Sequence, residues 1–296
     1  MKQKWLFVIN PKSGSKRRAD LAALIANTFG PDDFYELLAW EDPHKFEVIE
    51  EAIFSGKYTT VVAAGGDGTV NRVGACVMRA NLVLGILPLG SGNGLARSLG
   101  LPMRTDLALK QLLAWRVVSI DSAAVNGQPF FCTAGVGFDA HIGGLFAQST
   151  RRGLQSYVKL VLRELLRYRP QNYVLETDGV QSTLPAFLIT IANAGQYGND
   201  FYIAPQASMQ DGLLHIVLIK PFSLIKAPGI VRRLLGKQAH LSEGIVTTTA
   251  KKVLIKNENK NMIHFDGEPK EGDATLVFEI LPGSLKVLAG AGFKDG

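Results

Sequence analysis

Short apolar runs alternate with helical patterns over the first 120 residues, and this alternation allows few folds. The apolar runs lie near residues 5–9, 34–38, 59–64 and 82–87. The helical patterns lie near residues 16–29, 43–55, 69–80 and 94–99. Strands that alternate with helices form a parallel sheet with helices packed on it. The N-terminal part is therefore predicted to be an α/β domain over residues 1–120.

The pattern changes after residue 120. Apolar-rich runs are now separated by turn candidates, at Asn126-Gly127, Asp178-Gly179, Asp211-Gly212 and Asp266-Gly267. Such pairs favour the tight turns of β-hairpins. Because 296 residues are enough for two packed domains, we predict a second, mainly antiparallel β domain.

Two basic helices are predicted within the second domain, over Gln155–Arg169 and Ile230–Leu235. The first carries an apolar face, formed by Tyr157, Leu160, Val161, Leu165 and Tyr168. Its lysine and arginine residues lie mostly away from that face. Basic faces are typical of solvated helices and also of helices that lie on a membrane surface. The net charge of +6 favours anionic partners without choosing among nucleotides, nucleic acid and membranes.

Several classes of protein are disfavoured. No apolar stretch approaches the roughly 20 residues that cross a bilayer, and the apolar run Trp5–Ile9 is too short for a secretory signal. Cys76 and Cys132 form no CxxC pair, and the histidines show no zinc-site spacing. A reducing cytoplasm fits this pattern. No nucleic-acid partner is predicted, because no aromatic-basic readout motif is present.

The strongest chemical feature is an apolar run, Val61–Ala64, that enters the turn Gly65-Gly66-Asp67-Gly68-Thr69 and then a helix. Glycines let the backbone approach a phosphate, and a helix N-terminus directs its N–H groups at an anion. A carboxylate in such a phosphate site indicates a magnesium ion between the two. We therefore predict that Asp67 faces a metal. The alternative is an ordinary helix N-cap at Asp67 or Thr69.

Two further turns leave an apolar run and enter a helix. The first contains Asn10, Pro11, Ser13 and Gly14, and the second contains Ser91, Gly92 and Asn93. In an open parallel sheet, turns at the carboxyl ends of strands meet in one ligand-binding crevice. Neither the P-loop nor the dinucleotide fingerprint is present. All three turns are thus candidate phosphate-binding segments of a different type.

These motifs and their order resemble the diacylglycerol-kinase catalytic family of lipid kinases, which includes sphingosine and ceramide kinases and soluble bacterial lipid kinases. The resemblance covers nearly the whole chain. It rests on the three turns and on Gly135–Ala140, Ile203-Ala204-Pro205, Asp211-Gly212, Asp266-Gly267-Glu268 and Pro282–Leu285.

The resemblance implies an α/β nucleotide-binding domain of the kind shared with NAD kinase, followed by a β-sandwich over residues 121–287. It places the active site between the domains and returns a tail, about residues 288–296, to the first domain. It implies a cytoplasmic enzyme that uses ATP and Mg²⁺ to phosphorylate a lipid hydroxyl and that binds the inner face of the membrane reversibly. A homodimer is left open.

The resemblance also assigns a general base, Asp266, with Glu268 assisting it or positioning metal. A lipid hydroxyl must lose a proton as it attacks the γ-phosphorus, and a nearby carboxylate can accept that proton. The alternative for Asp266-Gly267 is a plain hairpin turn.

Two further sites follow from the same resemblance. A structural magnesium would be bound by the Asp211 side chain and by the carbonyls of Ser208 and Leu213, unless Asp211-Gly212 is an ordinary turn. Asp139 or His141 would contact the lipid headgroup. The alternative is that Asp139 is a buried carboxylate bonded to backbone amides.

The acceptor is left open between diacylglycerol-like and sphingoid-like lipids, because many diacylglycerol kinases have Asn-Asp where this chain has Ser91-Gly92-Asn93-Gly94. One alternative activity is NAD kinase, but the only Asn-Glu pair, Asn257-Glu258, lies in a polar turn. The other is a non-catalytic nucleotide- or lipid-binding regulator. The presence of a candidate base argues against the regulator, because binding alone needs none.

Overall fold

The chain divides into two compact units. The computed structural model describes residues 3–14, 18–30, 33–42, 45–149, 154–199, 201–238, 242–257 and 262–294. The first unit contains Met1–Asp121 and Pro282–Gly296, and the second contains Ser122–Leu281. The first boundary lies one residue from the predicted one, whereas the C-terminal segment of the first unit begins before the predicted tail. In the part of the chain that the structure describes, no helix has the length and apolar character needed to cross a membrane.

The first unit is built on a parallel sheet, as the alternation predicted. Its strands are β1 (Lys4–Ile9), β2 (Phe34–Ala39), β3 (Thr60–Gly65) and β4 (Val83–Pro88). Their order is β2-β1-β3-β4, and all pair in parallel. The end of β18 (Thr275–Ala289) adds to this sheet, because Lys286 and Val287 pair with β4.

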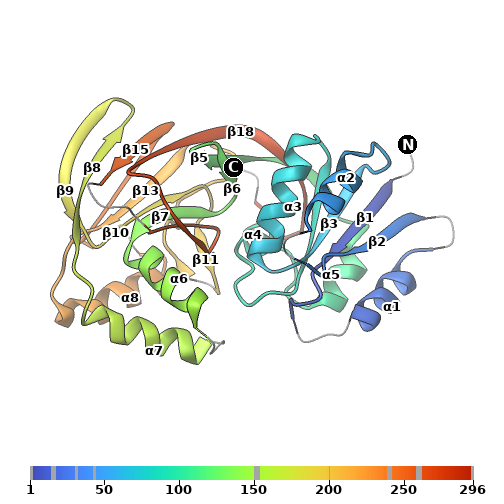
Figure 1. Ribbon diagram of the computed structural model, residues 1–296, viewed down its shortest axis with the longest axis horizontal. Coiled ribbons are helices and arrows are strands. Elements are labelled where there is room, and N and C mark those ends of the chain that lie inside the picture. Colours follow the sequence, from blue (N-terminus) through green and yellow to red (C-terminus); the bar gives the residue numbers. More distant parts are fainter. Residues whose placement is uncertain are drawn as a thin grey trace. The chain divides into compact units, whose positions relative to one another are not determined.

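Helices cover both faces of the parallel sheet (Figure 1). They are α1 (Arg18–Thr28), α2 (Glu47–Phe54), α3 (Asp67–Arg79) and α5 (Thr105–Leu112). Successive side chains of a strand point to opposite faces. Trp5, Phe7 and Ile9 of β1 therefore pack in one cluster with α1 and α5, while Leu6 and Val8 are buried on the face toward α2 and α3.

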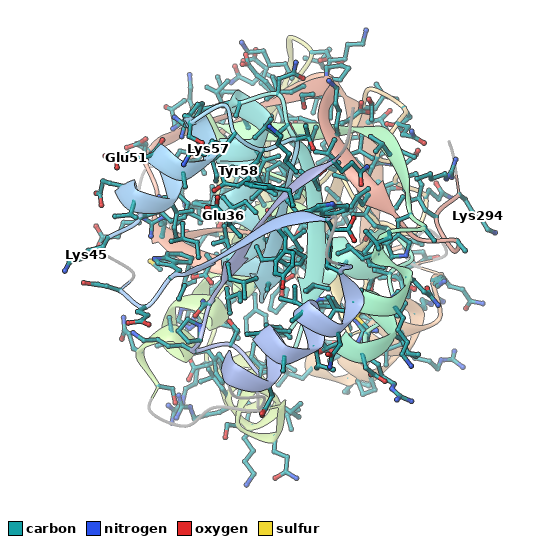
Figure 2. The ribbon with its side chains drawn as sticks, turned by 90° about the vertical axis from the view of Figure 1, so that its right-hand side faces the viewer. Glu36, Lys45, Glu51, Lys57, Tyr58 and Lys294 are labelled. Atoms are coloured by element: carbon teal, nitrogen blue, oxygen red, sulfur yellow. The ribbon has the colours of Figure 1, made fainter. Side chains whose placement is uncertain are left out.

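An edge contact secures β2 to the segment before β3. The Tyr58 hydroxyl donates to Glu36 Oε2 at 2.5 Å, and Figure 2 shows the two residues on one side of the first unit. Burial and the neighbouring Glu36 carboxylate raise the pKa of Tyr58 to about 12. Tyr58 therefore stays protonated and can donate throughout the physiological range.

The second unit is a β-sandwich. One sheet has the order β14-β13-β10-β7-β16-β17 and is antiparallel. Its strands are β7 (Thr133–Gly137), β10 (Leu188–Ala192), β13 (Leu214–Ile219), β14 (Ile245–Ala250), β16 (Met262–Phe265) and β17 (Glu268–Glu271). The other sheet contains β5 (Arg116–Val125), β6 (Gln128–Phe130), β8 (Gln171–Thr177), β9 (Val180–Ala186), β15 (Lys252–Lys256) and the first part of β18. Residues of both sheets form one apolar core.

Three helices cover the outer face of the first of these sheets. They are α6 (Phe138–Gln148), α7 (Leu154–Leu165) and α8 (Ala227–Leu235). Ile142, Leu160, Val161 and Ile230 pack in a second apolar cluster with the outward residues of β10 and β13. Both predicted basic helices are present, although α7 ends four residues before the predicted end at Arg169. The helix α6 was not predicted.

Three of the four predicted hairpin turns are found. Asn126-Gly127, Asp178-Gly179 and Asp266-Gly267 connect β5–β6, β8–β9 and β16–β17, and both residues of each pair have positive φ. This is the backbone that a type I′ turn requires. The prediction of a hairpin at Asp211-Gly212 was wrong. Only Gly212 has positive φ there, and the pair lies in a loop between β12 (Phe201–Tyr202) and β13.

Candidate functional site

Three strand-to-helix turns of the first unit contact one another at the carboxyl ends of β1, β3 and β4. The Asn10 backbone N–H donates to Ala64 O at 3.0 Å, and its side-chain Nδ2 donates to Thr69 Oγ1 at 2.9 Å. The Leu89 N–H donates to Gly65 O at 2.9 Å. The turn after β3 is therefore bonded to the turns on both sides of it.

Backbone contact between two glycines sets the spacing of the second and third turns. A Cβ atom on Gly90 would lie 2.6 Å from the Gly66 Cα. This distance is too short for any side chain, so the two turns meet backbone to backbone. The helix α3 begins at Asp67, directly after Gly66, and its first N–H groups have no partner within the helix. Such an N-terminus is suited to binding an anion.

Asp67 holds the third turn. Its Oδ2 accepts from the Asn93 N–H at 2.9 Å, and its Oδ1 accepts from the Gly94 N–H at 2.7 Å. Asn93 has the left-handed conformation, with φ of 52°, and its side chain exchanges two hydrogen bonds with the backbone of Gly90. The half-buried Asp67 thus fixes the start of the short helix α4 (Gly94–Ser98).

The other predicted residues of these turns are placed as follows. Pro11 and Ser91 are exposed, while Ser13, Gly68 and Gly92 are half-buried. Gly14 has a φ of 78° and lies against Leu89 O. The structure therefore brings the predicted phosphate-binding residues of all three turns to one edge of the sheet.

Asp139 is the centre of a buried polar network in the second unit. Its Oδ2 accepts from the Tyr197 hydroxyl at 2.7 Å and from Thr190 Oγ1 at 3.2 Å, and lies 2.9 Å from His264 Nε2. Its Oδ1 accepts from the Ala140 N–H at 2.8 Å. The carboxylate is therefore bonded chiefly to side chains, rather than to backbone amides as the alternative interpretation supposed.

The network changes the protonation of its members. Burial alone would raise the pKa of Asp139, but the charge and hydrogen bond of His264, with the Tyr197 and Ala140 donors, hold it below its usual value. Burial and the Asp139 carboxylate raise the pKa of Tyr197 well above its usual value. Asp139 is thus ionised and Tyr197 is protonated at neutral pH.

His141, the other headgroup candidate, has a different partner. Its Nε2 lies 3.2 Å from Glu164 Oε2 on α7, and its side chain is partly exposed. Glu164 also accepts from Arg163 Nε at 2.9 Å. The two headgroup candidates are therefore separated in role, because Asp139 is bonded within the unit and His141 stays accessible.

Asp266 lies in the β16–β17 hairpin turn. Its side chain accepts hydrogen bonds from backbone N–H groups just before β7 and at its first residue. Oδ2 accepts from the Phe131 N–H at 2.9 Å, and Oδ1 accepts from the N–H groups of Cys132 at 2.7 Å and Thr133 at 3.2 Å. The hairpin turn is therefore present and the Asp266 carboxylate is held in a fixed position, while its role as a general base stays a prediction. Glu268 follows on β17 and is exposed.

The Asp211 and Ser208 side chains of the predicted structural magnesium site are bonded to neighbouring protein groups. Asp211 Oδ1 accepts from the Leu213 N–H at 2.9 Å, and Oδ2 lies 2.8 Å from His215 Nε2. Ser208 Oγ accepts from the Gln210 N–H. Each carboxylate oxygen can accept more than one interaction, and the other predicted ligands are the carbonyls of Ser208 and Leu213, so the magnesium site stays a prediction.

Metal at the first unit would depend mainly on a nucleotide. Among the described residues, no group of three or more His, Cys, Asp or Glu side chains could hold a metal ion. Magnesium that accompanies a nucleotide is usually held by phosphates, water and one or two carboxylates. Asp67 is the carboxylate at the three turns and fits that limited role.

No role was predicted from the sequence for Tyr197, Thr190 or His264. One signal was present, because Thr190 interrupts the apolar strand Leu188–Ala192. The partners of Thr190 could not be named without the register that sets it opposite Gly135, whose other neighbour is His264.

Comparisons with known proteins agree with this division of the chain. Residues 4–125 match the model of the diacylglycerol kinase catalytic domain. Residues 132–289, more than half of the chain, match the YegS C-terminal NAD kinase beta sandwich-like domain. The chain belongs to the family of the YegS C-terminal NAD kinase beta sandwich-like domain and carries a diacylglycerol kinase catalytic domain before it. It is therefore a kinase, and the predicted resemblance is confirmed.

Relatives and solved structures match over nearly the full length. "Probable lipid kinase YegS-like" of Klebsiella pneumoniae is 29% identical, covering 95% of this chain and 94% of the relative. The protein of the same name in Pseudomonas aeruginosa UCBPP-PA14 is 29% identical, covering 98% and 96%. A crystal structure of a putative diacylglycerol kinase from Bacillus anthracis has a TM-score of 0.81 at 21% identity, covering 99% and 97%. That structural likeness confirms the fold.

Gly90→Ala should disturb the second and third turns together. The new Cβ would clash with Gly66 Cα, so we expect a loss of about 1–3 kcal/mol in the free energy of unfolding and a higher KM for nucleotide. Urea unfolding and steady-state kinetics measure the two effects. Gly30→Ala, which makes only an ordinary contact with Asp33, is the matched control. Equal behaviour of the two variants would show that the Gly66–Gly90 contact does not set the turn spacing.

Asp139→Asn should lower stability at neutral pH, because it removes the charge that faces His264. The folded-state pKa of Asp139 is below its unfolded value, so the stabilisation is present above that unfolded value, about pH 4, and is lost as the pH falls through the folded-state pKa. Urea unfolding across acidic and neutral pH should show wild type and variant converging at low pH. Asp20→Asn, at an exposed position on α1, should show no such convergence. A constant gap for Asp139→Asn would contradict the assignment.

Proposed function

We propose that this chain transfers the γ-phosphate of ATP to the hydroxyl of a membrane lipid with a diacylglycerol-like or sphingoid-like structure. The observation that carries the proposal is the contact of three strand-to-helix turns, through the Asn10–Thr69 hydrogen bond and the Gly66–Gly90 backbone contact, in a chain with a diacylglycerol kinase catalytic domain. Relatives with the name "Probable lipid kinase" span nearly the same length, which supports a lipid acceptor.

The three turns would bind the nucleotide phosphates. Phosphoryl transfer needs little covalent chemistry from the protein, so that positioning and electrostatic stabilisation provide most of the rate. Backbone N–H groups at the start of α3 suit a phosphate, and the Asn10–Thr69 hydrogen bond holds the first turn beside them. Asp67 would keep the third turn in place, through its bonds to Asn93 and Gly94.

A magnesium ion, when bound with the nucleotide, would neutralise charge that develops on the phosphates. Asp67 is the residue that we propose for it, directly or through water. The role of the chain itself is to keep the Asp67 carboxylate ionised and oriented, which its two backbone N–H donors favour.

Asp266 is the proposed general base. As the lipid oxygen bonds to the γ-phosphorus, the bond from that phosphorus to the bridging oxygen of ADP breaks, and the hydroxyl proton passes to the Asp266 carboxylate. The three N–H groups that bond Asp266 favour the ionised form that a base requires. They also make it a weaker proton acceptor, so its position matters more than its basicity. Glu268, two residues further on, is proposed to assist it.

Asp139 and His141 are the residues that we propose for the lipid headgroup. His141 is partly exposed and could contact the lipid directly. Asp139 is bonded to Tyr197 and His264, so we propose that it orients their side chains toward the headgroup.

The deciding experiment is γ-phosphate transfer from radiolabelled ATP, with magnesium, to detergent-dispersed lipids. The panel contains diacylglycerol, monoacylglycerol, sphingosine, ceramide, phosphatidylglycerol and undecaprenol. NAD is assayed in parallel, because the second domain belongs to an NAD kinase-like type. A labelled lipid would establish the activity and name the acceptor. Label on NAD alone would replace the proposal with NAD kinase. The Asn257 side chain, however, is bonded to Gln171, which disfavours that outcome.

Asp266→Asn separates a chemical role from an anchoring one. Loss of an acceptor for the backbone N–H groups should cost roughly 1–3 kcal/mol of stability in either role. As a base, Asp266 should in addition be worth about a hundredfold to ten-thousandfold in kcat, measured on folded protein, with nucleotide binding nearly unchanged.

Asp178→Asn is the matched control for that variant. Asp178 occupies the same kind of turn, and its carboxylate likewise accepts from backbone N–H groups, those of Lys251 and Lys252. We expect a full kcat for Asp178→Asn. Wild-type kcat in Asp266→Asn would end the assignment of the base, and a loss of stability with proportionate loss of activity would make Asp266 an anchor.

A further inference from the structure

Large apolar side chains project into solvent from α8 and from the 3₁₀ turn η1 (Leu224–Lys226) before it. Ile225 is 91% exposed, Leu224 is 48% exposed, and Val231 and Leu235 on α8 are also exposed. Scattered exposed apolar residues are ordinary, but a group of them on adjacent turns marks an interaction surface.

Basic residues surround this group. Lys226 and Arg232 are exposed beside it. Between Lys220 and Ser242 the sequence has five lysine and arginine residues and no aspartate or glutamate. An acid-free segment of this kind attracts anionic surfaces and repels other cationic ones.

The neighbouring helix α7 repeats the combination. Val158 and Leu162 of α7 and Leu166, directly after its last residue, recur at every fourth residue and form an exposed stripe, in which Leu166 is 71% exposed. Lys159 and Arg167 are exposed next to the stripe. These residues do not serve the core, because the core-facing positions of α7 are others, among them Leu160, Val161 and Leu165.

Both helices pack on one apolar cluster of the second unit. Ile230 and Leu234 of α8 join the same cluster as the inner face of α7, and Figure 1 shows the two helices on one side of the β-sandwich. Their exposed faces are therefore directed away from the same sheet. We name them together the basic-apolar face, formed by Val158, Leu162, Leu166, Leu224, Ile225, Val231, Leu235 and the adjacent Lys and Arg residues.

We propose that the basic-apolar face binds the surface of an anionic lipid bilayer, with Leu224 and Ile225 inserted at the level of the headgroups. Apolar side chains together with lysine and arginine are the combination by which helices lie in a membrane interface. The inference rests on the proposed function, because a diacyl or sphingoid acceptor remains in the bilayer while it is phosphorylated.

Charge decides against a second copy of the chain as the occupant. In a twofold dimer the same patch meets itself, so the acid-free segments of two copies would be brought together. That arrangement places like charges in contact and is unfavourable. An anionic bilayer instead complements the positive charge and accepts the apolar side chains.

The test is co-sedimentation of the full chain with vesicles of phosphatidylcholine alone and of phosphatidylcholine mixed with phosphatidylglycerol. We expect binding to the mixed vesicles that weakens as salt is added. Leu224→Ser/Ile225→Ser should weaken it about tenfold or more, through lost insertion. Lys226→Gln/Arg232→Gln should weaken it roughly thirtyfold on anionic vesicles and leave binding to phosphatidylcholine alone unchanged.

Matched controls are available on the same chain. Val180→Ser removes an apolar side chain that is 72% exposed on β9, outside the face, and Lys110→Gln removes an exposed charge on α5. Both should bind vesicles like the wild type. Circular dichroism and thermal unfolding of all variants exclude misfolding as the cause of any loss, because substitutions at exposed positions usually change stability little.

Two results would overturn the proposal. One is wild-type vesicle binding by both face variants. The other is self-association of the wild-type chain, measured by sedimentation velocity, that Leu224→Ser/Ile225→Ser abolishes, since it would assign the face to a second copy. Phosphorylation of detergent-dispersed lipid should be unaffected in the face variants. If no lipid is phosphorylated in detergent while the wild type binds vesicles through this face, the proposed function fails and the membrane surface stands.

Discussion

The backbone contact between Gly66 and Gly90 is the constraint on which the candidate nucleotide site depends. With no side chain between them, the turns after β3 and β4 approach closely enough for one carboxylate, that of Asp67, to reach the N–H groups of Asn93 and Gly94. A larger residue at either glycine would separate the turns and leave those N–H groups without this acceptor. The start of α3 and the third turn are consequently held rigidly against each other. Preorganisation of that kind is what a reaction controlled by positioning requires.

In the second unit, too, carboxylates hold separate segments of the chain together. Asp266 spans three consecutive N–H groups, and Asp139 gathers donors from β10, β16 and α6. A buried carboxylate is costly unless it is fully bonded, so each fixes the backbone or side chains around it. Gly135 lies between Thr190 and His264 in the sheet, and the absence of a side chain there leaves both donors unobstructed on that face.

The elements that were predicted from the sequence are those that local patterns determine. Apolar periodicity located the four parallel strands, and Asn-Gly and Asp-Gly pairs located three hairpins, because both signals act within a few residues. The helix α6 was missed because it begins directly after an apolar strand and contains Gly143-Gly144, which lower helix propensity. The Asp139 network was missed for a different reason. Its members come from positions 139, 190, 197 and 264, and only strand register and helix packing bring them together. Asp211-Gly212 failed as a hairpin because it lies in the loop before β13, where the Asp211 carboxylate bonds the Leu213 N–H and the His215 side chain of that strand.

Neither local sequence patterns nor core packing explains the exposed apolar residues of the basic-apolar face. An apolar side chain that is exposed in both the folded and the unfolded state adds almost nothing to folding stability, so the β-sandwich does not require Ile225 or Leu166. Their inner neighbours, such as Ile230 and Leu165, fully account for the attachment of the two helices to the sheet. Exposed apolar groups also promote unwanted association in water. The exposed apolar groups and the acid-free basic segment are therefore explained by a binding partner. The positive charge favours an anionic bilayer, which also accepts apolar side chains, over a second protein of like charge.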